Sequence, residues 1–151
     1  MGGRSLLNQK FDLDKGVIVE GRITARSASN RSQSYAGFYV EGAEKNTGTA
    51  IMLQVGEPQW RESKIGKLRT DTTFHFEALD VTGRNSATVT GLDNGKEHTF
   101  RLWLRGGQME LYIDDLLMQS FFFFTPTGRI GFLSQEAETQ ISMLKVYGMN
   151  L

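Results

Sequence analysis

Residues 98–124, HTFRLWLRGGQMELYIDDLLMQSFFFF, constrain the fold more than any other part of this chain. Apolar and polar side chains alternate through most of the stretch, and successive side chains of a β-strand point to opposite faces of its sheet. One face would carry Phe100, Leu102, Leu104, Met109, Leu111, Ile113, Leu116 and Met118. The other would carry Arg101, Trp103, Arg105, Gln108, Glu110, Tyr112 and Gln119. The pattern predicts three consecutive antiparallel strands with an apolar inner face and an outer face that mixes aromatic, charged and amide groups.

The first of the two expected turns fixes the pairing of these strands. Gly106-Gly107 supplies the positive φ angles that a two-residue hairpin loop requires. This turn pairs Trp103 with Glu110 and Arg101 with Tyr112. A slip of one residue would send Trp103 inward, because the two faces of a strand exchange with each step.

The second expected turn is Asp114-Asp115, since aspartate tolerates left-handed backbone angles. It would pair Tyr112 with Leu117. It would also place three polar or aromatic side chains in one row across three strands: Trp103, Glu110 and Gln119.

The rest of the chain also predicts short strands separated by turns. Seventeen glycines, two prolines and repeated alternation favour an all-β fold. Besides the three strands above, we expect strands near residues 16–25, 35–41, 50–55, 60–65, 73–81, 87–90, 128–133 and 140–147. This number of strands predicts a two-sheet antiparallel jelly-roll sandwich, formed as a single domain by residues 1–151. Residues 1–10 are expected to be irregular, with at most one short helical turn at 6–13.

Composition excludes several classes of function. The 17 basic and 17 acidic residues cancel, whereas a nucleic-acid-binding protein normally carries a basic excess. The chain has no cysteine, so neither a disulfide framework nor thiolate chemistry is expected. No apolar run approaches the roughly 20 residues that cross a bilayer as a helix. We therefore expect no nucleic-acid partner and no membrane span.

Several segments together resemble a known fold family. They are GVIVEGRIT, SYAGFYVEG, HTFRLWLRGGQMELYIDD, TGRIGFLSQ and SMLKVYGM. Their order resembles the concanavalin A-like lectin/glucanase (laminin-G-like) sandwich. It also resembles the C-terminal sandwich of family 32 glycoside hydrolases and the family 66 carbohydrate-binding modules, which act on fructans. The resemblance implies a non-catalytic carbohydrate-binding module of a secreted or surface polysaccharide-degrading system, with an extracellular or cell-surface location and fructan as the first candidate ligand.

The candidate binding site is the mixed outer face. Sugar rings present C–H patches that stack on aromatic rings, and their hydroxyls pair with carboxylate, amide and guanidinium groups. Trp103 and Tyr112 are expected to supply the stacking plane. The polar contacts are expected from Arg101, Arg105, Glu110 and Gln119, with Trp60 and Tyr39 at the rim. The alternative is a solvated sheet face on which the same charges form cross-strand pairs beside an exposed tryptophan.

Two other functions stay open at this stage. Four consecutive phenylalanines at 121–124 leave Phe121 and Phe123 off the inner face if Phe122 continues that face. We expect other parts of this domain to cover them, but the sandwich could instead pack on a catalytic domain of the same parent chain. A small glycoside hydrolase would need two carboxyl groups about 5–10 Å apart across a cleft. The candidate pairs are Asp114/Asp115, Asp12/Asp14 and Glu136/Glu138, and none forms an E-x-D-x-E strand.

Metal and cofactor chemistry has little support. His75 and His98, the only histidines, lack the ligand spacing of a zinc site. Calcium occurs in many related sandwiches, and its candidate ligands here are loop oxygens of Asp12, Asp14, Glu41 and Glu44. Because no D-x-D-x-D-G loop is present, no cofactor is expected.

Overall fold

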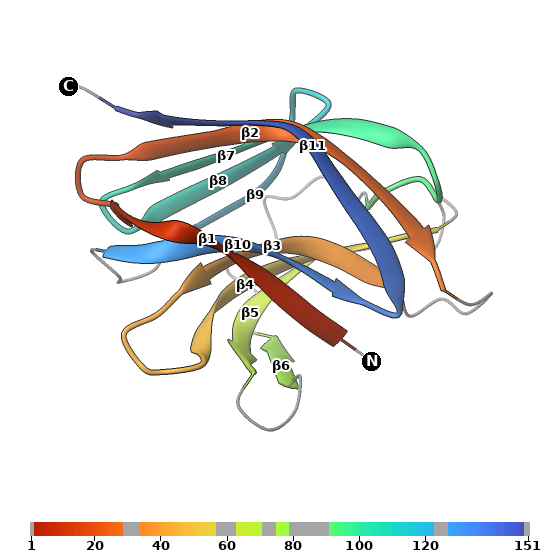
Figure 1. The fold of residues 1–151 in the computed structure, drawn as a ribbon, viewed down its shortest axis with the longest axis horizontal. Coiled ribbons are helices and arrows are strands. Elements are labelled where there is room, and N and C mark those ends of the chain that lie inside the picture. Colours follow the sequence, from red (N-terminus) through yellow and green to blue (C-terminus); the bar gives the residue numbers. More distant parts are fainter. Residues whose placement is uncertain are drawn as a thin grey trace.

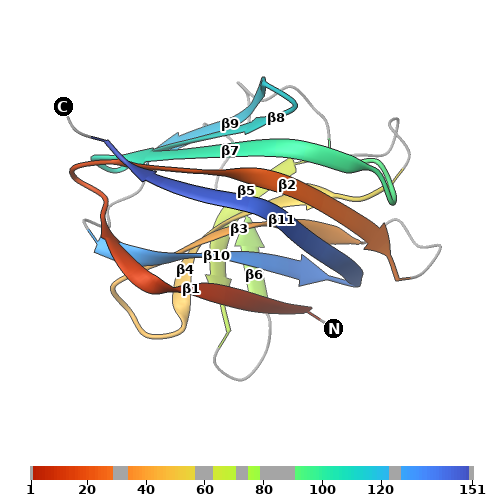
Figure 2. The ribbon, with the colours of Figure 1, turned by 45° about the horizontal axis from the view of Figure 1, so that its top comes forward.

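The computed structural model describes residues 2–28, 34–56, 63–70, 75–78, 91–122 and 127–149, and every regular element in these ranges is a β-strand. The strands form two antiparallel sheets that lie face to face (Figures 1 and 2). The six-stranded sheet has the order β1 (Gly2–Asp12), β10 (Thr127–Gln135), β3 (Tyr35–Glu41), β4 (Thr47–Gln54), β5 (Ser63–Arg69) and β6 (His75–Ala78). The five-stranded sheet has the order β11 (Ala137–Gly148), β2 (Val17–Ser27), β7 (Glu97–Arg105), β8 (Gln108–Ile113) and β9 (Leu116–Phe122). The predicted all-β jelly-roll sandwich is confirmed.

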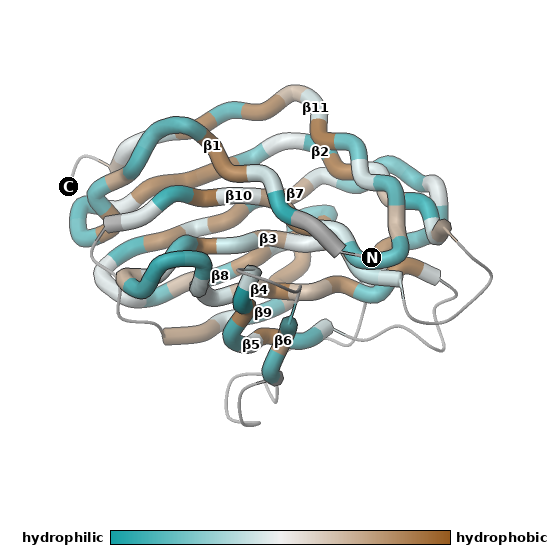
Figure 3. The backbone as a smooth tube through the Cα atoms, turned by 60° about the horizontal axis from the view of Figure 1, so that its bottom comes forward, coloured by the Kyte–Doolittle hydropathy of each residue, from teal (hydrophilic) through white to brown (hydrophobic). Residues whose placement is uncertain are grey.

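The core lies between the two sheets because alternate residues of each strand point inward. Figure 3 shows hydrophobic and hydrophilic residues alternating along the strands. Three rings from three strands meet at the centre. The ring centroid of Phe38 on β3 lies 4.9 Å from that of Phe100 on β7 and 5.8 Å from that of Phe132 on β10. These contacts join the sheets through aromatic packing in tilted and edge-on arrangements.

The outer face of the six-stranded sheet carries a second apolar cluster. Its buried members are Tyr35, Tyr39, Ala50, Met52, Leu68 and Leu133, and Leu6 and Phe76 pack against them. Strands β3 and β4 are therefore buried on both faces. Such strands read as nearly continuous apolar runs, as SYAGFYV and AIMLQV do.

The N-terminal segment is a strand, so the expectation of an irregular segment at 1–10 with a helical turn at 6–13 is wrong. β1 pairs antiparallel with β10 along its length, with one register shift between Leu6 and Lys10. Leu7 and Phe11 pack against the core. The free energy gained when these side chains are buried, as the segment pairs with β10, outweighs a weak local preference for a helical turn.

The remaining strand predictions have different outcomes. The strand expected near 60–65 is β5, which begins at Ser63, and the strand expected near 73–81 contains β6. The strand expected at 87–90 lies outside the described residues. Within the described ranges there is no helix long and apolar enough to cross a membrane.

Candidate functional site

Trp103 lies on the outer face of β7. This strand is the middle strand of the five-stranded sheet (Figure 1). The residue is 39% exposed, whereas its neighbours Leu102 and Leu104 are fully buried. The predicted inward and outward alternation of this strand is therefore confirmed. An indole in the middle of a sheet has neighbouring strands on both sides, so its environment is built by side chains from those strands.

The first hairpin has the predicted register. Trp103 pairs with Glu110 and Arg101 pairs with Tyr112. The two turn glycines have φ angles of 56° and 85°, in the left-handed region that glycine adopts without strain. Because directly opposed residues share a face, these four side chains lie on one outer surface.

The second hairpin departs from the predicted register by one residue. Tyr112 pairs with Leu117 as predicted, but Glu110 lies opposite Ser120 instead of Gln119. The register shifts between the two pairs, so one residue between Leu117 and Gln119 has no partner on β8. Such a β-bulge reverses the inward and outward order of every residue beyond it.

This bulge moves Gln119 into the interior. Gln119 is 1% exposed, and its Nε2 donates a hydrogen bond to Ser63 Oγ on the facing sheet at 2.9 Å. The same reversal makes Phe121 pack against the core and leaves Phe122 68% exposed, the opposite of the sequence-based expectation. The prediction that Gln119 lies on the outer face is wrong, and the last two phenylalanines of the run lie outside the described residues.

Strand pairing adds residues that the sequence did not single out. One row across the five strands consists of Tyr147, Ile18, Trp103, Glu110 and Ser120. The next row consists of Lys145, Glu20, Arg101, Tyr112 and Leu117. No local pattern predicts that β2 and β11 pair in this register beside β7. Tyr147 is 45% exposed, and no alternation marks it in the sequence, because every residue of β11 from Met143 to Gly148 is exposed.

Arg101 and Tyr112 hold one another in place within the second row. The Arg101 guanidinium carbon lies 4.9 Å from the centroid of the Tyr112 ring, a cation–π geometry. Arg101 Nη1 is 3.6 Å from Asp115 Oδ1, and the Tyr112 hydroxyl donates to Glu110 Oε2 at 3.1 Å. Burial, and then the hydrogen bond and charge of Glu110, raise the pKa of Tyr112 above its ordinary value. Because Arg101 covers the Tyr112 ring, Trp103 is the more open stacking surface.

Two hollows open on this outer face. The first, of about 290 Å³, lies between β2, β7, β8 and β11 and is lined by charged residues with Tyr112 and Met143. The second, of about 470 Å³, is lined by Trp103 and Ile18 together with Arg105, Gln108 and Glu110, and by the end of β11. Five of the predicted site residues therefore divide between two separate hollows: Arg101 and Tyr112 line the first, and Trp103, Arg105 and Glu110 line the second.

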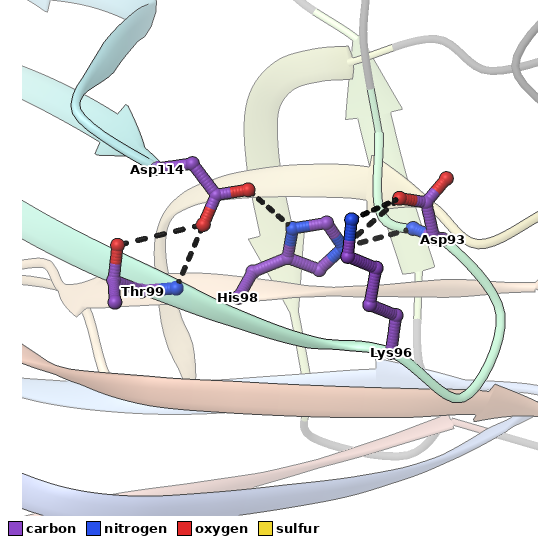
Figure 4. A network of polar contacts seen from close by, with 5 residues as sticks. All are labelled: Asp93, Lys96, His98, Thr99 and Asp114. Carbon is purple, nitrogen blue, oxygen red and sulfur yellow. Dashed lines mark hydrogen bonds and ion pairs between the residues drawn. The ribbon is translucent and has the colours of Figure 1, made fainter.

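The turn between β8 and β9 borders the first hollow through Asp115, and the polar network drawn in Figure 4 holds this turn. Asp114 and Asp115 have φ angles of 50° and 66°, as a two-residue hairpin turn requires. Asp114 Oδ2 lies 2.6 Å from His98 Nδ1, and its Oδ1 accepts the backbone N–H of Thr99 at 3.0 Å. The backbone N–H of Asp93 donates to the other ring nitrogen, His98 Nε2, at 3.1 Å. This network holds the turn from which Asp115 reaches Arg101.

Tyr39 and Trp60 do not join this surface. Tyr39 is fully buried in the outer cluster of the six-stranded sheet, with the guanidinium of Arg4 5.2 Å from its ring centroid. Burial raises the pKa of Tyr39, and the charge of Arg4 opposes that rise. The expectation that Tyr39 extends the Trp103 face is wrong because the two residues lie on different sheets. Trp60 lies outside the described residues.

The proposed calcium ligands are also dispersed. The described residues contain no group of three or more His, Asp or Glu that could hold a metal ion. Asp12 accepts the backbone N–H of Asp14, and Glu41 binds Arg129 at 3.1 Å. The four candidate residues therefore do not form one site.

Comparison with known proteins places this geometry in a known fold. No family model and no curated protein sequence matches the chain. Among solved structures, the carbohydrate-binding module CBM66 from Bacillus subtilis is similar, with a TM-score of 0.69 and 13% identity over 97% of this chain and 82% of that one. The metal-free carbohydrate recognition domain of Emp46p has a TM-score of 0.62 and 15% identity over 99% and 79%. A variant of human galectin-16 has a TM-score of 0.57 and 15% identity over 97% and 94%. The chain therefore has the concanavalin A-like sandwich fold that its sequence predicted.

Proposed function

We propose that this domain binds carbohydrate on the outer face of its five-stranded sheet and does not chemically change it. The observation that carries the proposal is the exposed indole of Trp103 beside a hollow of about 470 Å³. The flat apolar face of an indole stacks on the C–H face of a sugar ring. A sheet that only needed to be soluble would gain nothing from a tryptophan at this central position.

Polar groups beside Trp103 provide the complement to sugar hydroxyls. Arg105 and Gln108 oppose each other at the end of the first hairpin and line the same hollow as Glu110. A guanidinium only donates, a carboxylate only accepts, and an amide does both. Hydroxyl groups donate and accept as well, so each of these side chains can satisfy one.

Residues of two of the candidate catalytic pairs lie in turns with positive φ angles. Asp114 is engaged by His98 and by the backbone of Thr99, and it lies in a turn. Glu136, of the third pair, has a φ of 51° in the turn before β11, and its backbone carbonyl accepts the N–H of Ala28 and the hydroxyl of Ser34. These placements support recognition without hydrolysis.

The parent system and the ligand are part of the same proposal. The solved structures that share the fold include proteins described as a carbohydrate-binding module and as carbohydrate recognition domains. We propose a recognition module of a secreted or surface polysaccharide-degrading system, joined to a catalytic domain in its parent chain. Fructan is the first glycan to test, because the sequence resembles family 66 modules.

Retention on immobilised polysaccharides tests the binding function. The wild-type domain should be retained by at least one glycan, and Trp103→Ala should weaken that binding at least about tenfold, the equivalent of about 1.4 kcal/mol. Trp103→Phe should restore part of it, because phenylalanine keeps a stacking surface. Leu116→Ala is the matched control, since Leu116 is 60% exposed and lines neither hollow. Equal retention of wild type and Trp103→Ala, with both folded by circular dichroism, would refute this site.

A second function is favoured by one observation. Leu116 and Phe122 are 60% and 68% exposed on β9, one of the two edge strands of the five-stranded sheet. Exposed apolar side chains on one edge suit a sandwich that packs against a catalytic domain. That function predicts that no glycan retains the domain, so the same screen separates the two functions.

A further inference from the structure

The two hollows lie in line along β2. The first is lined by Glu20, Gly21 and Arg22 of this strand, and the second by Ile18. On β7, the first hollow contacts residues 99–101 and the second contacts residues 103 and 105. Their midpoints are three residues apart on β2 and four residues apart on β7, which corresponds to roughly 10–13 Å at about 3.3 Å per residue. That separation is longer than one sugar ring.

Strand β11 forms one wall of both hollows. Its register with β2 shifts between Ser142 and Lys145, and Met143 there has a φ of 53°. A bulge of this kind redirects side chains, and Met143, 63% exposed, borders the first hollow with Lys145. Gly148 and Met149 border the second hollow, where the backbone N–H of Met149 donates to the carbonyl of Gly16 at 3.0 Å.

The opposite wall is formed by the outer side chains of β7 and β8. Arg101 and Tyr112 stand beside the first hollow, and Trp103 and Glu110 stand beside the second. β2 lies between these two walls, and the two hollows, which follow one another along the strands, are together named the trough. Both walls come from strands of one sheet, so their spacing is fixed by backbone hydrogen bonds.

The charges along the trough have both signs. The first hollow contains the cations Arg22, Arg101 and Lys145 and the anions Glu20 and Asp115. The second contains Arg105 and Glu110. Arg22 is paired with Glu97 at 3.2 Å, which lowers the cationic excess of the first hollow further. An anionic chain would meet a carboxylate in each hollow, whereas neutral hydroxyls can donate to the carboxylates and accept from the cations.

We infer that the two hollows are successive subsites of one trough, which binds an internal stretch of a neutral polysaccharide laid along β2. Trp103 stacks on one sugar unit, and Arg101 and Tyr112 orient a later unit. This inference rests on the proposed function and adds to it the class of ligand, an extended neutral chain in place of a single terminal sugar.

Titration calorimetry with oligosaccharides of increasing length tests the inference. The series is prepared from the glycan that retains the wild-type domain, from the monosaccharide to the hexasaccharide. Affinity should rise at least tenfold with length and then become constant once both hollows are filled. Arg101→Gln should reduce the affinity of long oligosaccharides toward that of short ones and leave short ones unchanged, whereas Trp103→Ala should weaken all lengths.

Matched variants separate a local effect from a loss of folding. Lys145→Ala removes a second group of the first hollow from an edge strand and should repeat the pattern of Arg101→Gln. Arg129→Gln is the control, because Arg129 pairs with Glu41 on the six-stranded sheet, away from the trough. It should leave the length dependence unchanged.

The outcomes distinguish this inference from the proposed function. Binding that depends on Trp103 but is equally tight for the monosaccharide and the hexasaccharide overturns the trough and leaves the binding function intact. If the domain binds a polyuronate more tightly than its carboxyl-reduced form, and added salt weakens this binding steeply, the inference that the ligand is a neutral polysaccharide is refuted. Absence of retention on every glycan overturns the proposed function and the trough with it.

Discussion

Replacement of His98 by alanine tests how the turn between β8 and β9 is held beside the first hollow. The imidazole is 5% exposed and links Asp114 to the backbone N–H of Asp93. Because Nε2 accepts the hydrogen bond from that N–H, the proton of the neutral ring lies on Nδ1 and is donated to the Asp114 carboxylate. Both turn aspartates have positive φ, which aspartate tolerates better than most residues but still at some cost, so contacts from outside the turn add to its stability.

The expected cost of His98→Ala is about 3 kcal/mol of unfolding free energy. A hydrogen bond to a charged group contributes roughly 1.5–3 kcal/mol, and we take about 1 kcal/mol because the Asp114 side chain is 48% exposed. The orphaned Asp93 N–H adds about 1 kcal/mol, and the space left by the ring adds about the same. For a domain of this length the melting temperature should fall by roughly 6–12 °C.

The assay is urea unfolding of wild type, His98→Ala and Asp114→Asn across a range of pH. Burial raises the pKa of Asp114, but hydrogen bonds from His98 and the Thr99 backbone and nearby positive charge lower it more, so the pKa lies below its ordinary 3.8. The ionised carboxylate therefore stabilises the fold above pH 3.8, and this contribution is lost as the pH falls through the lowered folded-state pKa.

Two results would contradict this account of the turn. Asp114→Asn keeps a residue that tolerates positive φ, so it should cost about 1 kcal/mol at pH 7 and become equal to wild type in acid. If the difference in unfolding free energy between wild type and Asp114→Asn stays constant from pH 7 into acid, the charge of the carboxylate has no role. A cost of His98→Ala below about 0.5 kcal/mol would show that the turn is held by its own backbone.

Three further substitutions test the packing. Tyr39→Phe should change the free energy of unfolding by less than about 1 kcal/mol, because the buried Tyr39 hydroxyl has no hydrogen-bond partner among the described residues. Tyr39→Ala removes the buried ring and should cost about 3–5 kcal/mol. A denaturant titration measures both. Gly37→Ala should cost at least about 3 kcal/mol, visible as a lower melting temperature, because the added carbon would overlap the backbone carbonyl oxygen of Ile51 on β4. Phe122→Ser should change the melting temperature little, since Phe122 is 68% exposed and surface changes usually stay within about 0.5 kcal/mol; a large drop would show that its ring packs in the fold.

The part of the site that could be predicted from the sequence is the part encoded locally. The Gly106-Gly107 turn fixes the first hairpin, and from there the pairing of Trp103 with Glu110 follows by counting. The second hairpin has an equally clear turn, but its bulge lies several residues beyond that turn. Nothing in the sequence LLMQSFFFF marks which residue is left unpaired. Met118 can face inward because it is apolar, and Gln119 can do so because Ser63 on the facing sheet accepts its hydrogen bond.

Non-local pairing is the second limit. Tyr147, Glu20 and Lys145 reach the Trp103 face only because β2 and β11 lie beside β7 in one particular register. That register depends on the burial of Val19 and Ile23 against the other sheet. The residues that cover them are distant in the sequence, so no short stretch of the chain predicts this contact. The alternation of each strand was readable, but the order of strands in the sheet was not.

Trp103 and Tyr39 show why alternation alone does not distinguish an open face from a closed one. Each is an aromatic residue at an outward position of a central strand, yet one is 39% exposed and the other is fully buried. Trp103 has Glu110 as a cross-strand neighbour, and a carboxylate keeps its surroundings hydrated. Tyr39 has Ala50 on one side and glycine on the other, so apolar side chains close over it at little cost. The exposure of the proposed binding surface is therefore determined by the charged residues around the tryptophan as much as by the ring itself.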